Sequence, residues 1–577
     1  ELELMLDGSL DQSNPNITVT ASGTTAYKEG VIDPEQAYEF TGNNQLIVDG
    51  MGSLSSFTIA GWLFIEDLKD SAEVTLIKSS RGTNQFRWYF HYLNPTDPDN
   101  RSTHLVFQSN AIKGGNGPTG NSVQHHFDRF AEHSNEFVNR TSFTFQHRGP
   151  DIWKHIALTY DAQKKEVTTY LYGRRDAVIP LTDAQAVSFG RLLLAPNSKN
   201  NQRFLGRLRE VKVFDRVLSG DEVDELGAWE PKLWGNKDVD NWLPSKTVLY
   251  VDQETGDDDN DGSENAPVET IQKGLDLIQG PGTRLVIRPG KYYEQGVTFD
   301  EMAGTRLEPI IIEAETPGTV TLDGAVPFNA TWTPTGYPNE YTAPWTENTG
   351  NWTRDGDDNL GHRNELIVQD GNLLMPLEAW NDDDLYNLPE GLVFEEGMFF
   401  IDEANQQIIL RTATDPNDSV FEMGSRIWLL SVTNTHHVVI RGITFQHNKG
   451  NGWTTAINLK GSSHMVVEDC VIRNTGGRGL WGGGPTQGSY VPHDMIYRRL
   501  HFENTGGGAF EMSHSYILAE DIQVDGGYWR MTHAQNINAH AVLFKQLSVA
   551  HLTMRRVVVN EPEETQHLWF DGNNWNI

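Results

Sequence analysis

The chain has 577 residues, enough for roughly three or four domains at about 100–200 residues each. With 45 Lys and Arg against 79 Asp and Glu, its net charge of −34 excludes a general nucleic-acid binder, because binding a polyanion needs clustered cations. The one Cys excludes disulfides within the chain and cysteine-based zinc sites. No apolar run approaches the ~18 residues of a membrane span, and the many Gly, Asn and Asp turn signals indicate a mostly β protein.

The sequence starts at Glu1, without an initiator Met or a signal peptide, so we expect a processed or trimmed chain. A strongly acidic β protein with a single Cys fits a bacterial protein from a salty environment. We therefore expect a secreted, periplasmic or cell-surface location.

Residues 1–228 are predicted to form a β-sandwich. Period-two alternation runs through 57–62, 155–160 and 167–172, with Gly, Asn and Asp between the runs, as in antiparallel strands. The closing stretch 204–219 follows the same pattern.

Together with the opening Leu6-Asp7-Gly8-Ser9, this order of runs resembles the laminin-G-like, concanavalin A-like jelly roll. The resemblance implies a domain that binds glycan or packs on a catalytic neighbour, with a structural spacer as the alternative. Such domains often hold calcium. Asp7 and Asp11 are the candidates, although lone aspartates in loops usually form turns.

Residues 229–246 are predicted to form a linker, because Trp229, Pro231, Trp234 and Trp242 stand in a stretch with no apolar period. A linker with three Trp is expected to pack along both domains and fix their angle.

Residues 247–577 begin with a strand at 248–252, an acidic loop at 256–262, an amphipathic helix at 266–278 and a strand at 284–293. This order resembles the start of the right-handed parallel β-helices of carbohydrate-active enzymes. The resemblance implies that the helix covers an otherwise open sheet edge.

The acidic loop places Asp257, Asp259 and Asp261 at alternate positions before Gly262, so these oxygens could hold a structural calcium ion. The Glu that an EF-hand requires is absent from its position, and a solvated turn is the favoured alternative. We expect no required cofactor.

From residue 427 onward short strands repeat in two columns. The first column is 440–445, 467–472, 496–502, 519–524 and 553–558; the second is 456–460, 479–483, 509–513, 541–545 and 567–571. Repeats of a few tens of residues make a solenoid whose turns bury their apolar faces on one another. Residues 325–425 interrupt it with alternating strands and hairpin turns, predicted to form a small inserted β-sandwich.

The predicted fold is therefore all-β: a jelly roll at 1–228, then a right-handed parallel β-helix at 247–577 with that insert. Strand alternation assigns the faces of the second column. The predicted interior row is Ile457, Leu480, Phe510, Val542 and Leu568. The predicted outer rows are Asn458, Trp481, Glu511, Leu543 and Trp569, followed by Lys460, Gly483, Ser513, Lys545 and Asp571.

The order of these elements, with the late motif 568–574 (Leu-Trp-Phe-Asp-Gly-Asn-Asn), resembles the β-helix glycoside hydrolases of families 120 and 141. The resemblance covers about 247–577. It implies that Asp571 is a catalytic carboxylate and that a glutamate follows one turn later, beyond Ile577. We therefore expect a further segment or another chain to complete the β-helix.

Within the chain, Glu511 is the best partner for Asp571, with Cα atoms about 11–12 Å apart by strand geometry. Two such carboxyl groups can hydrolyse a glycosidic bond. Lys545 is predicted to lie one strand from Asp571 in the same row and to keep it ionised, although a plain ion pair is equally compatible.

Around these groups, Trp481 and Trp569 are predicted to stack on sugar rings. His514, His540 and His567 could bind hydroxyl or sulfate groups. The expected partner is thus a poly- or oligosaccharide from a cell wall or an alga, with no nucleic acid and no membrane.

Two other functions remain open. A polysaccharide lyase could use Lys545 as base with Arg530, Arg555 or Arg556, and a non-catalytic adhesin could bind glycan without forming product. New reducing ends, an unsaturated uronate or neither product would distinguish hydrolase, lyase and binder.

Overall fold

A computed structural model describes residues 2–4, 16–24, 27–28, 37–67, 73–93, 102–126, 153–196, 204–228, 233–235, 242–294, 296–346, 365–377, 393–402, 404–450, 454–483, 493–513, 515–527, 542–547, 550–560 and 566–571. The chain divides into two compact units, Glu1–Lys232 and Leu233–Ile577. In the described parts, no helix is long and apolar enough to cross a membrane.

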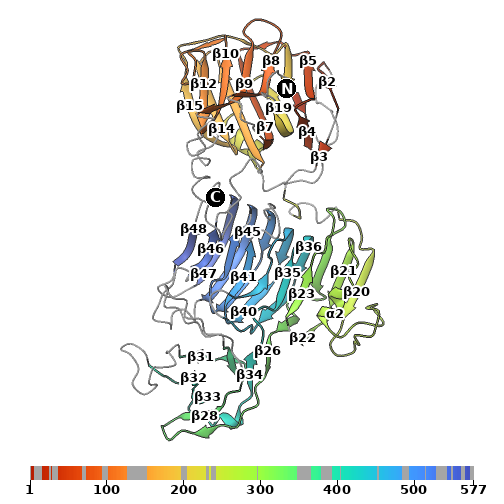
Figure 1. Cartoon of the computed structure of the whole chain (residues 1–577), viewed down its shortest axis with the longest axis vertical. Helices are drawn as coiled ribbons and strands as arrows, with labels where there is room; N and C mark the ends of the chain where they lie inside the picture. Colours follow the sequence, from red (N-terminus) through yellow and green to blue (C-terminus); the bar gives the residue numbers. More distant parts are fainter. Residues whose placement is uncertain are drawn as a thin grey trace. The chain divides into compact units, whose positions relative to one another are not determined.

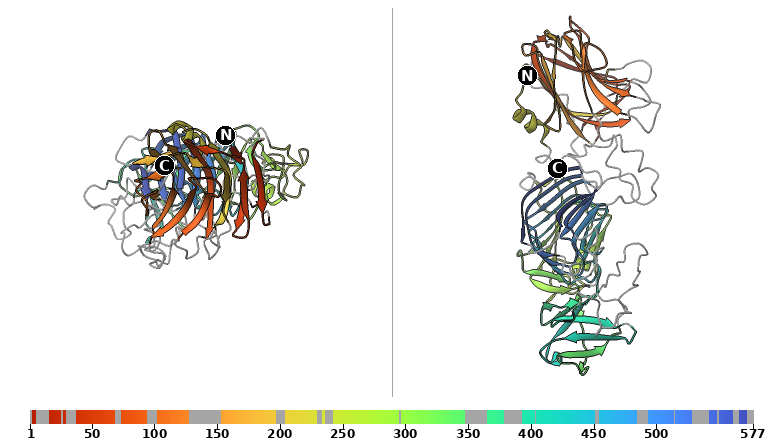
Figure 2. Two further views of the ribbon diagram at one scale, coloured as in Figure 1. Left: turned by 90° about the horizontal axis from the view of Figure 1, so that it is seen from above. Right: turned by 90° about the vertical axis from the view of Figure 1, so that its left-hand side faces the viewer.

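The first unit is a sandwich of two antiparallel sheets (Figures 1 and 2). One sheet has the order β15 (Arg174–Pro180), β14 (Glu166–Leu171), β13 (Lys154–Asp161), β7 (Ser56–Asp67), β19 (Leu205–Phe214), β4 (Ala37–Thr41) and β3 (Tyr27–Lys28), with β1 (Leu2–Leu4) also on β19. The other has the order β12 (Ser122–His126), β10 (Ser102–Ser109), β9 (Phe86–Leu93), β8 (Glu73–Ser79), β18 (Arg191–Leu194), β5 (Gln45–Asp49) and β2 (Thr18–Ser22).

Two small pairs complete this unit, β11 (Ile112–Lys113) with β16 (Asp183–Ala184) and β6 (Ser53–Leu54) with β17 (Val187–Ser188). Helix α1 (Gly220–Gly227) follows the last strand and begins with a capping box, in which Ser219 and Glu222 satisfy each other's backbone N–H groups.

The second unit is built from parallel strands that the chain visits in a fixed order of three. Face A contains β20 (Thr247–Val251), β21 (Thr283–Ile287), β24 (Ile310–Ala314), β36 (His436–Arg441), β39 (Ser463–Glu468) and β42 (His493–Arg498). Face B contains β22 (Gly290–Tyr293), β25 (Val320–Asp323), β37 (Ile443–Gln446), β40 (Val471–Thr475) and β43 (His501–Thr505). The long strands β45 (Ser515–Gly527) and β47 (Ala550–Asn560) run through both faces and join them into one sheet.

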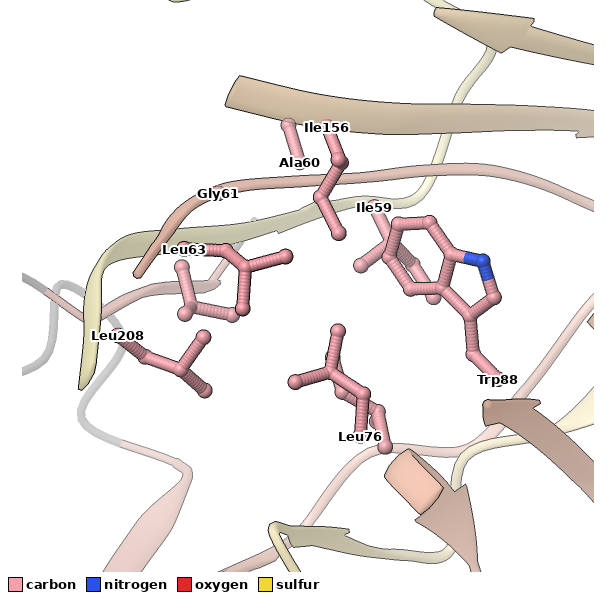
Figure 3. A pocket seen from close by; sticks show the side chains of 10 residues that line it. Ile59, Ala60, Gly61, Leu63, Leu76, Trp88, Ile156 and Leu208 are labelled. Carbon is pink, nitrogen blue, oxygen red and sulfur yellow. The ribbon is translucent and has the colours of Figure 1, made fainter. Parts of the chain in front are cut away.

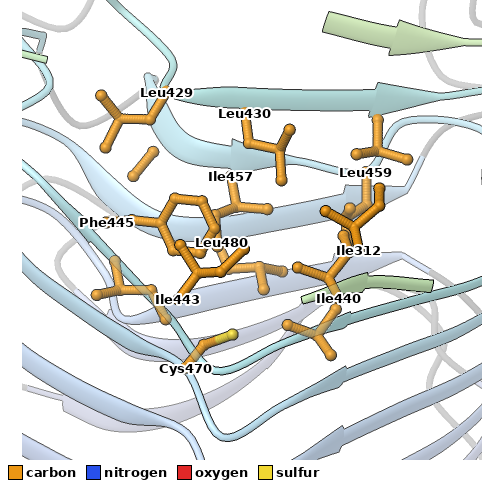
Figure 4. Close-up of a cluster of buried hydrophobic side chains, with 14 of the residues drawn as sticks. Ile312, Leu429, Leu430, Ile440, Ile443, Phe445, Ile457, Leu459, Cys470 and Leu480 are labelled. Carbon is orange, nitrogen blue, oxygen red and sulfur yellow. The ribbon is translucent and has the colours of Figure 1, made fainter. Parts of the chain in front are cut away.

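Face C is a separate sheet of seven parallel strands. Its order is β23 (Val297–Asp300), β35 (Leu430–Thr433), β38 (Thr455–Asn458), β41 (Arg478–Gly483), β44 (Phe510–Ser513), β46 (Val542–Leu547) and β48 (Gln566–Asp571). Ile440 of face A, Phe445 of face B and Ile457 of face C meet in one buried apolar core (Figure 4). Helix α2 (Ile271–Asp276) adds Ile271 and Leu275 to that core at the β20 end.

Face A carries a ladder of charges that alternate in sign from strand to strand. In register the ladder is Glu313, Arg441, Glu468, Arg498, Glu520 and Arg555. Arg498 Nε lies 2.7 Å from Glu468 Oε2, and Arg555 Nε lies 2.7 Å from Glu520 Oε2. Each carboxylate is thus held by guanidinium groups of neighbouring strands, and we call this set the face A ladder.

The insert is a pair of small sheets. One has the order β26 (Ala325–Pro327), β34 (Phe421–Gly424), β29 (Ile367–Gln369) and β30 (Asn372–Leu373). The other has the order β27 (Thr333–Pro334), β28 (Glu340–Pro344), β33 (Gln407–Arg411), β32 (Met398–Asp402) and β31 (Met375–Pro376), and a short 3-10 helix (Pro416–Asp418) precedes β34. Trp332 and Trp345 lie in the insert's apolar core.

Part of the expected linker belongs to the second unit. Trp234 stacks on Trp242 at 5.5 Å between ring centroids and meets His437 of β36 edge-on at 5.0 Å. The Trp234 backbone N–H also donates to Asp494 Oδ2 of β42 at 3.1 Å. Trp229 and Pro231 lie outside the described residues.

Candidate functional site

One row of residues crosses the side of face C opposite to the core. In strand order the row is Thr298, Ser431, Asn458, Trp481, Glu511, Lys545 and Trp569, each paired in register with the next. Their strand neighbours Leu480, Phe510 and Phe544 lie in the core, and successive residues of a strand face opposite sides. We call this set the face C row; strands β23, β35, β41, β46 and β48 of this face are labelled in Figure 1.

Glu511 of this row is ion-paired with Arg478, which lies outside the row. Arg478 Nη2 lies 3.1 Å from Glu511 Oε2, and the two side chains are only 6% and 10% exposed. A carboxylate that contacts a guanidinium makes a charge-assisted contact, which suits a group that acts as a base or a nucleophile. Arg478 stands at the start of β41, one strand before Glu511.

Lys545 lies between Glu511 and Trp569 in the row. Its Nζ is 4.4 Å from the centre of the Trp569 ring, a cation–π contact. The residue is buried, whereas Trp481 and Trp569 are half-buried. The row thus combines two indole rings with one carboxylate and one cation, Lys545.

The register of β46 corrects two sequence expectations. Phe544, not Val542, pairs with Phe510, and Lys545, not Leu543, pairs with Glu511. Lys545 therefore lies beside Trp569 instead of Asp571, which pairs with Leu547. A shift by two residues leaves every side chain on its own face, so alternation alone could not detect it.

Asp571 is the last residue of β48, two residues beyond Trp569. Face C therefore places Asp571 two strands from Glu511 and two residues further along. Leu568 occupies the predicted interior row but is 46% exposed, because β48 is the last strand of face C in the described chain.

The described structure places none of the three predicted histidines beside the face C row. His567 lies in β48 next to Leu568, and nothing further is described of it. His514, His540 and Arg530 lie outside the described residues. Arg555 belongs to the face A ladder and Arg556 binds Asp521, so neither stands beside Lys545.

The structure adds a buried acid–histidine cluster that the sequence did not suggest. Asp323 Oδ1 lies 3.0 Å from His447 Nδ1, while Gln446 Nε2 donates to Asp323 Oδ2 at 2.6 Å. Lys291 Nζ lies 2.9 Å from Asp323 Oδ2 and 3.5 Å from Glu422 Oε1 of the insert.

Burial raises the pKa of Asp323, but hydrogen bonds from His447, Gln446 and Lys291 outweigh burial and bring the pKa down to about 2. These residues span positions 291–447, and only stacking of β22, β25 and β37 brings them together.

The acidic loop is built from turns. Asp257 Oδ1 accepts the backbone N–H of Asp259 at 2.9 Å, and Asp261 Oδ1 accepts that of Ser263 at 3.0 Å. Hydrogen bonds from the backbone and the side chain of Ser263 lower the pKa of Asp261. The described residues contain no group of three or more His, Cys, Asp or Glu placed to hold a metal. Calcium at this loop stays a prediction, and Asp7 and Asp11 lie outside the described residues.

The first unit encloses a small cavity in its core (Figure 3). Ile59, Leu63, Leu76, Trp88 and Leu208 are among its apolar lining residues. Its volume of about 10 Å³ is no more than a single water needs, and an apolar lining leaves such a space dry. The cavity is a packing gap and cannot hold a sugar.

Comparison with known proteins identifies the first unit. Residues 40–224 match the concanavalin A-like lectin/glucanases superfamily, which confirms the predicted jelly roll. No curated protein matches the sequence.

Solved structures give only distant likenesses. XylC in complex with xylose shares 13% identity at a TM-score of 0.39, over 53% of this chain and 58% of that one. Domain 4 of AbnA, a GH43 extracellular arabinanase from Geobacillus stearothermophilus, in complex with arabinotriose, shares 16% identity at 0.25, over 39% and 97%. The binding domain of botulinum neurotoxin serotype D shares 13% at 0.29, over 42% and 52%. At these TM-scores the likenesses support no inference about activity.

Proposed function

We propose that the second unit is a right-handed parallel β-helix and that the protein is a secreted glycoside hydrolase. Its substrate is a poly- or oligosaccharide bound on the outer side of face C. The observation that carries the proposal is that Glu511, paired with Arg478, stands in one row with Trp481 and Trp569.

Hydrolysis of a glycosidic bond needs two carboxyl groups on either side of it. Glu511 is the first, held in charged contact with Arg478 and therefore suited to act as base or nucleophile. Asp571 is the second, two strands and two residues away, at a Cα separation of about 11–12 Å. Side chains that approach each other from that separation suit an inverting arrangement, with carboxyl groups about 6.5–9.5 Å apart.

The aromatic residues of the row would supply binding. Indole rings present an apolar face that stacks on the C–H face of a sugar ring, while the N–H stays available to a hydroxyl. The first unit, as a concanavalin A-like domain, would bind glycan without catalysing its cleavage.

A polysaccharide lyase is the second candidate. It is favoured by the placement of two cations, Arg478 and Lys545, beside Glu511 on face C. In that reaction Lys545 would remove the proton next to a uronate carboxylate, which Arg478 would bind. A C=C bond would form as the C–O bond to the leaving sugar breaks, and the leaving oxygen would take a proton from water.

The test is incubation of the protein with xylan, arabinan, polygalacturonate and alginate. New reducing ends without ultraviolet absorbance support the hydrolase. Absorbance of an unsaturated uronate supports the lyase. Retention of the protein by a polysaccharide without any product would leave a binding protein and reject both enzymes.

A further inference from the structure

Face C extends well beyond the proposed catalytic pair, and its far half has a different chemistry. Thr298, Ser431 and Asn458 continue the face C row on β23, β35 and β38. Asn458 Nδ2 donates to Ser431 Oγ at 3.0 Å. This half of the row is neutral and carries hydroxyl and amide groups, the groups that exchange hydrogen bonds with sugar hydroxyls.

Two exposed aromatic rings stand at the turns that lead into this half. Trp428, two residues before β35, is 40% exposed, and Tyr293, at the end of β22, is 47% exposed. A Cβ added at Gly296, just before β23, would lie 3.4 Å from Trp428 Nε1. The Trp428 indole therefore leans over the turn that joins β22 to β23.

Charged groups surround Tyr293. Lys291 Nζ lies 4.6 Å from the centre of the Tyr293 ring, and the Tyr293 hydroxyl is 3.4 Å from Glu422 Oε1 of the insert. Tyr293 is thus an exposed ring with charged groups beside it, and Trp428 and Ile427 are exposed nearby on the turn before β35. A ring with an apolar face and a polar edge suits a sugar, which offers both C–H groups and hydroxyls.

We propose that the site takes an extended polysaccharide chain running across the strands of face C, with Trp428 as a distal stacking residue. This inference rests on the proposed function and names its substrate class: a long polymer, bound along several consecutive units, instead of a disaccharide. The chain lies over Trp569, Lys545, Glu511 and Trp481, and continues over Asn458 and Ser431 toward Trp428.

The spacing of the row supports a long ligand. Neighbouring strands of a sheet are about 4.8 Å apart, so the six steps from β48 to β23 span about 29 Å. That length exceeds a disaccharide several times over. The Trp428 end lies three strands from Glu511, or about 14 Å, which only a chain of several sugar units can bridge from the catalytic pair.

The test compares Trp428→Ala with wild type on oligosaccharides from disaccharide to octasaccharide. They are prepared from whichever of xylan, arabinan, polygalacturonate or alginate the wild type degrades. Tyr337→Ala is the matched control, because Tyr337 is an aromatic residue 49% exposed in the turn between β27 and β28 of the insert. We expect the wild-type kcat/KM to rise with chain length up to about the hexasaccharide. Trp428→Ala should lose about tenfold on the octasaccharide, the equivalent of about 1.4 kcal/mol, and keep its rate on the disaccharide. Tyr337→Ala should match wild type throughout.

A kcat/KM independent of chain length, or equal octasaccharide rates in wild type and Trp428→Ala, would overturn the inference while leaving the hydrolase intact. If the wild type degrades none of the four polymers, the proposed function fails. The inference is then decided by electrophoresis through gels containing each polymer. Weaker retardation of Trp428→Ala than of wild type and Tyr337→Ala supports it, and equal migration of all three rejects it.

Discussion

Faces A and C are built on the same stacked circuits of chain, yet their outer rows follow opposite rules. On face A, Glu468 contacts Arg498 and Arg499 at 2.7 and 2.8 Å, and Glu520, two strands further on, contacts Arg555 and Arg556 at the same distances. On face C, a single carboxylate, Glu511, stands between Trp481 and Lys545 in a row that otherwise holds an indole, an amide and hydroxyls. The first row is made of charges that pair with one another, whereas the second sets one ion-paired carboxylate among aromatic and polar groups that a ligand could use.

The difference follows from stacking. Parallel strands place equivalent residues about 4.8 Å apart, so a column of like charges would repel and a column of alternating charges attracts. A slip of one strand by one position would break the pairs that its ladder residue makes with both neighbouring strands. The ladder therefore favours one pairing register of the strands on face A. The outer residues of face C are then not needed for register and can bind or act on a ligand.

Glu511→Gln should have the largest effect. Removing the proposed base or nucleophile should lower kcat by about 10³-fold, because the carboxamide can neither take a proton nor attack. Product formation on the responsive polysaccharide is the measurement. Glu468→Gln is the matched control, the same change at a buried, ion-paired Glu of face A. Equal loss of turnover in both variants would contradict the claim that face C carries the reaction and face A only stabilises the fold.

Asp571→Asn should reduce turnover by a similar factor, since hydrolysis needs the second carboxyl group. The change removes a charge and little volume, so the circular dichroism spectrum and the unfolding temperature should stay near wild type. Retained wild-type turnover would remove Asp571 from the mechanism and favour the lyase alternative around Lys545.

Glu468→Gln should instead reduce stability, by about 3 kcal/mol, because it leaves guanidinium groups of neighbouring strands without their shared carboxylate. Urea unfolding followed by tryptophan fluorescence measures this loss. An unchanged midpoint would mean that the ladder does not secure the strands.

Asp323 of face B, which neither the face A ladder nor the face C row includes, allows a test by pH. The pKa of Asp323 is depressed to about 2 in the fold, so its stabilising contribution is present above about pH 4 and is lost as the pH falls toward 2. At neutral pH that contribution is about 2 kcal/mol. The free energy of unfolding of wild type should fall in this window, and Asp323→Asn should lack this part of the decline. Parallel pH curves for the two proteins would refute the assignment.

Trp569→Ala should have the smallest effect. Loss of one stacking ring should raise KM about tenfold or less and leave kcat nearly unchanged, because the ring binds substrate and does not react. Initial rates over a range of polysaccharide concentrations separate the two constants. A fall in kcat alone would indicate that Trp569 acts on the reaction itself, through its contact with Lys545.

The sequence predicted which residues form strands better than it predicted which residues pair between neighbouring strands. Alternation in 456–460 and 509–513 correctly separated core from surface, and the jelly roll of the first unit was recognisable from its strand order. The register of β46 could not be predicted, because pairing Phe510 with either Phe544 or Val542 satisfies the same alternation. Only packing of the large Phe544 ring against Phe510, at 5.2 Å between centroids, distinguishes the two.

The candidate site was predictable only in part, for a related reason. Trp481, Glu511 and Trp569 lie within regular strands, so their common row could be inferred. Arg478 follows the glycine-rich turn 476–477, where no alternation applies, and its pairing with Glu511 depends on the path of that turn.

The most direct test of the account is the crystal structure of Glu511→Gln with a bound hexasaccharide of the responsive polymer. We expect the sugar chain on the outer side of face C, stacked on Trp481 and Trp569, with a glycosidic bond beside residue 511. A hexasaccharide bound only to the first unit, or along the face A ladder, would contradict the central claim that face C is the substrate site.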